Sequence, residues 1–142
     1  MPSPIDVQLI LCDAAQADPT GKLHMLGAGW SRTPSPTAPM ALAAIIKVPW
    51  DRANEKIRMT FTLVDADGHQ VTVPTPMGPQ PIQSVGEIEV GRPAGLAHGT
   101  PIDAAFALNV GSLPLQEGRY QWRLDLADEQ ANAFFTVQNV NA

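Results

Sequence analysis

Residues 115–126 read Leu115-Gln116-Glu117-Gly118-Arg119-Tyr120-Gln121-Trp122-Arg123-Leu124-Asp125-Leu126. From Tyr120 onward, apolar side chains such as Trp122 and Leu124 alternate with charged or amide side chains. This period of two is typical of a β-strand that buries one face and exposes the other to water. A short polar segment follows and leads into residues 134–137, Phe-Phe-Thr-Val, so the two segments predict a closing β-hairpin.

Similar strand-like segments are spread along the whole chain, and glycines and prolines separate them. No segment shows a sustained helical period. We therefore expect an all-β fold, a single-domain antiparallel β-sandwich over residues 1–142 of the immunoglobulin-like or jelly-roll type. It should have about eight or nine strands, which span approximately residues 5–14, 22–31, 40–48, 56–66, 70–73, 84–91, 104–110, 119–126 and 133–138.

The composition argues against two classes of partner. The formal net charge is −5, and the nine Lys and Arg residues are scattered, so we expect no nucleic acid partner, which would require clustered cations. No segment has the uninterrupted apolar length of a membrane helix, and the N-terminal residues lack the apolar core of a signal peptide. We expect no membrane association and a cytoplasmic location.

The residue types that carry chemistry lack the spacing of a catalytic or metal site. His24, His69 and His98 are the only histidines, and none stands at a recurring metal-ligand spacing. Asp65 and Asp67 resemble the start of a calcium loop, but the later ligands are absent from the sequence. We interpret that segment as a hairpin turn and expect no catalytic residue, no metal and no cofactor, and therefore no enzyme.

Cys12 is the only cysteine of the chain, so no disulfide can form within it. It lies in the apolar segment 9–12, which is typical of a thiol that packs in the core. We expect a buried and unreactive thiol, although a nucleophilic Cys12 served by one of the histidines is an alternative.

Trp30 and Trp50 are candidates for contact with a partner. Each stands at the expected end of a strand, Trp30 before the proline-rich segment 33–39 and Trp50 directly after Pro49. An aromatic ring in that position either caps the sandwich or anchors a partner.

The segment 40–46 is apolar on both faces. As a strand it directs Met40, Leu42 and Ile46 to the core, and the opposite face is left to Ala41, Ala43 and Ile45. Contiguous exposed apolar surface usually marks an interface, so these three residues are candidate contacts for a protein partner or a homo-oligomer. The alternative is that another part of the chain covers them. The contact could also use the proline-rich segments 33–39 and 74–81, which predict stiff surface loops.

Several segments together resemble one protein family. They are DVQLILCDAA at 6–15, GKL at 21–23, LGAG at 26–29, LVDADG at 63–68, RPAGL at 92–96, and the pattern Leu-x-x-Gly-x-Tyr at 115–120. The chain resembles a widespread family of small bacterial β-sandwich proteins of unknown function, found especially in actinobacteria and in their bacteriophages. The resemblance implies a single-domain sandwich and assigns no functional residue.

Gly118 and Tyr120 also resemble the tyrosine corner of immunoglobulin-like sandwiches, in which the phenol hydroxyl bonds a nearby backbone group. That motif has a structural role.

These observations favour a non-enzymatic structural or protein-interaction module. The family resemblance leads to a more specific expectation: an accessory protein of a bacteriophage particle, either a decoration protein or a minor structural protein. Its location would then be the virion. A small-molecule or carbohydrate-binding protein that stacks its ligand on Trp30 or Trp50 is the alternative. An enzyme of unknown class comes third.

Overall fold

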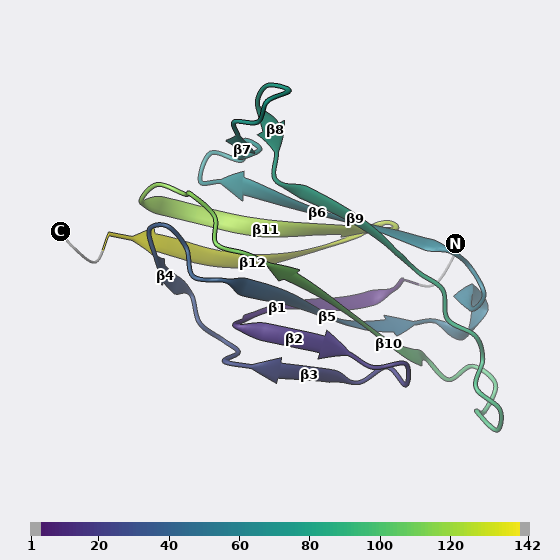
Figure 1. Ribbon diagram of the computed structural model, residues 1–142. Helices are drawn as coiled ribbons and strands as arrows, with labels where there is room; N and C mark the ends of the chain where they lie inside the picture. The colour runs from purple at the N-terminus through teal and green to yellow at the C-terminus, as the bar shows by residue number, and fades with distance from the viewer. Residues whose placement is uncertain (1–3, 140–142) are drawn as a thin grey trace.

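The computed structural model describes residues 4–139, and over this range the chain is all-β, with twelve strands and one short 3-10 helix (Figure 1). The all-β class is confirmed, whereas the expected number of strands was too low. The strands are β1 (Asp6–Cys12), β2 (Ala14–Ala17), β3 (Leu23–Leu26), β4 (Arg32–Pro34), β5 (Met40–Val48), β6 (Ile57–Asp65), β7 (Thr72–Val73), β8 (Gln80–Pro81), β9 (Gln83–Ile88), β10 (Ile102–Val110), β11 (Gly118–Leu126) and β12 (Glu129–Gln138), and the helix is η1 (Trp50–Arg52).

Two sheets face each other across the core. One has three strands in the order β1-β5-β10, and the other has five in the order β4-β12-β11-β6-β9. All neighbours pair antiparallel except β4, which runs parallel to β12. Their facing side chains form one apolar cluster, which is the packing of a β-sandwich.

The closing hairpin forms as the alternation predicts. Trp122 on β11 is paired with Ala133 on β12, and both are buried in the core. The Trp122 indole N–H points to the Met40 sulfur at 3.4 Å, so the ring reaches the facing sheet. The apolar faces of the two sheets are buried against each other. Removal of this apolar area from water is the dominant favourable contribution to folding.

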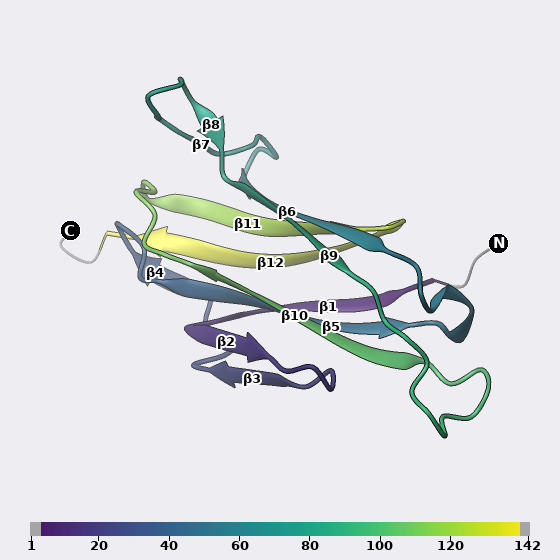
Figure 2. The ribbon, with the colours of Figure 1, turned by 45° about the vertical axis from the view of Figure 1, so that its right-hand side comes forward.

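A third layer covers part of the three-stranded sheet. The strands β2 and β3 form a hairpin against the outer face of β5 and β10, and Figure 2 shows it on the side away from the five-stranded sheet. Gly21 in its turn comes so close to β10 that an added Cβ would lie 2.9 Å from the Asp103 carbonyl oxygen. This close approach, together with a φ of +88°, explains why glycine occupies the position.

The strand expected over residues 5–14 is therefore divided. β1 ends at Cys12 and β2 begins at Ala14, because the chain turns at Asp13 to pass over the outer face of the sheet. The Asp13 amide donates to the Leu26 carbonyl at 2.8 Å, and this bond closes the base of the β2–β3 hairpin.

The proline-rich segments 33–39 and 74–81 are not entirely loops. Segment 33–39 contains the last two residues of β4, and segment 74–81 contains the whole of β8. Proline has no amide donor, but β4 lies at the edge of the five-stranded sheet, where a strand needs partners on one side only.

Among residues 4–139, no helix has the length and apolar character needed to cross a bilayer. The single domain expected over residues 1–142 includes residues 1–3 and 140–142, which lie outside the described range.

Candidate functional site

A cavity of about 930 Å³ opens at the end of β5, where the chain turns into η1. Its walls come from three parts of the chain: Asp6 on β1, the end of β5 with η1, and the segment 96–103 that leads into β10. Pro49, Trp50, Leu96 and Pro101 supply apolar surface. The volume lies within the range of roughly 300–1,000 Å³ that is common for ligand pockets.

Trp50 is held in this cavity by two neighbouring side chains. The Arg92 guanidinium carbon lies 4.6 Å from the centre of the indole ring, and the His98 ring meets it edge-on at 5.1 Å between centroids. Arg92 also donates through Nη2 to the Trp50 carbonyl at 2.8 Å. The ring is half-buried and fixed in position, so it can contact a partner at a low cost in side-chain entropy.

Carboxylates outnumber cations along the wall of this cavity. Lys47 stands directly opposite Asp6 on β1 and Asp103 on β10, and it forms an ion pair with Asp103. Asp51 on η1 also lines the cavity. The lining holds three aspartates and one lysine, so even with Arg92 against the Trp50 ring the carboxylates exceed these cations by one. This balance favours an approaching positive charge.

The structure corrects the expected contact surface on β5. Ala41 and Ala43 are fully buried, because Leu23 and Met25 of the β2–β3 hairpin pack on them. For Ala41 and Ala43, therefore, the alternative expectation is correct: another part of the same chain covers them. Ile45 lies beyond the hairpin and stays half-buried, between Gln8 and Ala105 on the neighbouring strands.

Trp30 lies near the other end of β5. It lines a cavity of about 500 Å³ together with Ala38 and Pro39, which lead into β5, and its ring meets Phe135 edge-on at 6.1 Å. Its indole nitrogen is buried and has no hydrogen-bond partner within the described range. Trp30 and Trp50 therefore do not form one contact surface.

Tyr120 makes the hydrogen bond that a tyrosine corner requires. Its hydroxyl donates to the Gln116 carbonyl at 2.8 Å, and its ring stacks on Phe135 at 5.7 Å. A Cβ on Gly118 would be in ordinary contact with the Tyr120 ring. Burial and, to a smaller extent, the Asp65 charge raise the pKa of the phenol above its usual value of 10.0. This geometry supports a structural role for both residues.

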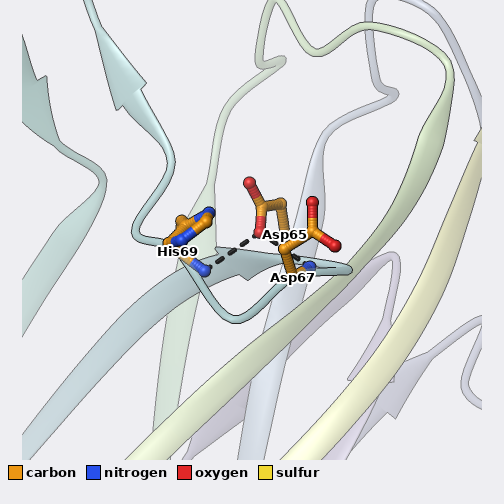
Figure 3. A group of neighbouring side chains, drawn as sticks. All are labelled: Asp65, Asp67 and His69. Atoms are coloured by element: carbon orange, nitrogen blue, oxygen red, sulfur yellow. Dashed lines mark hydrogen bonds between the residues drawn. The ribbon is translucent and has the colours of Figure 1, made fainter.

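Asp65, Asp67 and His69 bring three possible metal-ligand atoms within 4.8 Å of one another (Figure 3). Asp65 Oδ1, however, accepts hydrogen bonds from the Asp67 and His69 amides, both at 3.0 Å. A carboxylate that accepts bonds from the following amides stabilises a turn. The group is therefore explained by the hairpin turn that the sequence predicts.

Cys12 is fully buried, and its thiol points to the Ala41 carbonyl at 3.6 Å. Burial, with a smaller contribution from the Asp13 charge, raises the pKa of this thiol above its usual 9.0. A thiol that is both inaccessible and protonated is a poor nucleophile.

Sequence reasoning missed the neighbours of Trp50. Arg92, His98 and Asp103 lie close together in sequence but far from Trp50 and from Asp6, and no spacing rule connects these segments. The only local signal was the segment around Arg92, which is one of the segments that carry the family resemblance.

The fold and this cavity define a small β-sandwich protein with an open, aromatic-lined pocket at one end. The chain belongs to the family of unknown function DUF6941, whose model matches residues 8–137. This confirms the expected membership of a family of unknown function, whereas a bacterial or bacteriophage origin stays a prediction. No curated protein matches the chain.

Proposed function

We propose that this protein is a non-enzymatic protein-interaction module and that its contact surface is the cavity around Trp50. The observation that carries the proposal is the fixed, half-buried Trp50 ring in a cavity whose apolar wall is built partly from prolines. Aromatic anchors held rigidly in a pocket are frequent hot spots of protein interfaces. The excess of aspartates supports a partner that presents lysine or arginine side chains.

The particular role that we propose is that of an accessory protein of a bacteriophage particle, with the virion as its location. The support for it is the family resemblance of the sequence. The position of the gene among virion-assembly genes would agree with this role, and a position among sugar-transport genes would argue against it.

A small-molecule or carbohydrate-binding function is the second candidate. The volume of the cavity supports it, because about 930 Å³ is sufficient for a ligand of moderate size. The cation over the Trp50 ring weakens it, because Arg92 already lies against the indole surface that a sugar would use for stacking.

The proposal is tested by affinity capture followed by binding measurements with the purified partner. Trp50→Ala should reduce binding at least about tenfold, as expected for a hot-spot residue. Phe134→Ala is the matched control, because this aromatic ring is 68% exposed on a strand of the opposite sheet. Equal losses for the two variants, or none for either, would contradict the proposed surface.

The second candidate is tested on the same protein by ¹⁵N NMR of the three tryptophan indole groups. A saccharide that shifts only the Trp50 indole signal would favour carbohydrate binding over the protein-interaction proposal. Circular dichroism of Trp50→Ala establishes in both experiments that the variant is folded.

A further inference from the structure

The strand β10 has an unpaired side. It pairs along all nine residues with β5, and within residues 4–139 no strand pairs with its other edge. The β2–β3 hairpin contacts its outer face through the Asn109 side chain and forms no backbone ladder with it. The outward backbone N–H and C=O groups of an edge strand are a template for a further strand.

The other edges are protected in ways that β10 is not. β1 lies against β12 of the facing sheet, β4 has only three residues, and β9 carries Gly86 and Glu87. In β10 there is no proline, glycine or lysine, and Asp103 is the only charged residue. Long, apolar edges without such protection are the ones that pair with another chain.

The side chains on the inner face of β10 pack on the core but are not fully covered. Phe106, Leu108 and Val110 are only partly buried, whereas Leu42 and Ile46 on the adjacent β5 have no exposed surface. A strand added beside β10 would cover these three side chains and remove apolar area from water.

We propose that two copies of this chain pair antiparallel through β10, with the two-fold axis at Phe106. In this register Ile102 lies opposite Val110 of the second copy, Ala105 opposite Ala107, and Asp103 opposite Asn109. The inner face is then apolar throughout, and the two Asp103 carboxylates lie at opposite ends of the interface. Like charges do not face each other, so the strand is complementary to itself, as a two-fold interface requires.

This second interface uses the backbone edge of β10 and does not rest on the proposed function, whose partner surface is the Trp50 cavity; of the residues of β10, only Asp103 also lines that cavity. The pairing joins the two three-stranded sheets into one continuous sheet of six strands. Each copy keeps its Trp50 cavity, which lies at the end of β5.

The first test is the mass of the purified full-length protein, measured by sedimentation velocity over a range of concentrations. We expect twice the mass of one chain, with dissociation on dilution. A protein that remains a single chain at every concentration would overturn the proposal.

The second test identifies the register through single-cysteine additions. Residues directly opposite each other in an antiparallel pair have Cα atoms about 4.5–5.5 Å apart, which is within disulfide geometry. Under mild oxidation, a mixture of the Ala105→Cys and Ala107→Cys proteins should form a covalent dimer. Neither variant should do so efficiently alone, because identical positions lie diagonally across the two-fold axis.

The control is the unmodified chain, whose only thiol, Cys12, is buried. Alanine to cysteine is a small change, and circular dichroism establishes that both variants fold. Equal crosslinking of the mixture and of the separate variants would overturn the register. A stable dimer without crosslinking of the mixture would place the interface elsewhere and also overturn the proposal.

Discussion

The side chain of Asn109 on β10 forms two hydrogen bonds with the backbone of Ala15 on β2. Its Nδ2 donates to the Ala15 carbonyl at 3.0 Å, and its Oδ1 accepts from the Ala15 amide at 3.3 Å. The Asn109 carboxamide thus satisfies both the amide N–H and the carbonyl of Ala15 in the hairpin. It holds the β2–β3 hairpin on the outer face of the sandwich, where the hairpin covers Ala41 and Ala43.

Asn109→Ala should loosen the hairpin with little effect on the sandwich. We expect a loss of about 1 kcal/mol in the free energy of unfolding, because the two bonds are close to solvent. Hydrogen exchange should become faster at the amides of β2 and β3 and stay unchanged in β6 and β11. Asn132→Ala is the control, since Asn132 is exposed on β12; an equal effect of both changes would contradict the role of Asn109.

Lysine should have different effects at two of the three candidate contact positions on β5, Ala43 and Ile45. Ala43→Lys places a charge under the hairpin and should cost about 3 kcal/mol or more, because a buried charge without a partner is strongly unfavourable. Ile45→Lys should cost about 1 kcal/mol, since the half-buried side chain can reach water. Urea denaturation compares the two variants, and equal losses would show that the hairpin does not cover Ala43.

Tyr120→Phe removes the hydroxyl that bonds the Gln116 carbonyl and retains the ring that stacks on Phe135. The expected loss is about 1 kcal/mol, the usual net contribution of one hydrogen bond. Tyr120→Leu removes the stacking as well and should cost about 1 kcal/mol more. If urea denaturation shows no loss for Tyr120→Phe, the corner does not contribute to stability.

The titration of Tyr120 can be followed directly, because it is the only tyrosine in the chain. Its pKa should lie above 10.0, mainly because of burial and partly because of the Asp65 charge. The pKa of the folded state exceeds that of the unfolded state, so the associated stability is complete below pH 10 and is lost as the pH rises through the folded-state pKa. Absorbance near 295 nm follows the ionisation of the phenol and so gives its pKa. Asp65→Asn should lower this pKa but leave it above 10.0, because burial is the larger cause of the shift.

Cys12 should not react with a thiol reagent while the protein is folded. It has no exposed surface, and its raised pKa keeps the thiol protonated. Labelling with a chromogenic disulfide should therefore follow the rate of unfolding, with complete reaction in urea as the control. Rapid labelling of the folded protein would contradict the burial of Cys12 under the hairpin.

The sequence was sufficient for the features that depend on alternation along one strand. The period of two in residues 118–126 predicts which side chains of β11 face the core, and Trp122 and Leu124 are buried accordingly. Similarly, Met40, Leu42 and Ile46 face the core on β5. Strand formation and facing direction follow from adjacent residues, so a local pattern contains the information.

The strand boundaries were less predictable. The division of the first strand at Asp13 depends on the Leu26 carbonyl that accepts its amide proton, and β4 depends on its pairing with β12. Both are contacts between distant segments. The local turn and strand preferences of these residues do not reveal such contacts.

By itself, the sequence of this protein determined an all-β chain with alternating strands, a buried Cys12 and two apolar faces on β5, because side-chain polarity and spacing act locally. Only the tertiary structure decided that the β2–β3 hairpin covers Ala41 and Ala43 while Trp50 meets Arg92 and His98 at an open cavity. The physical reason is that an apolar residue in a strand must leave water, but what covers it depends on where distant segments cross the sheet.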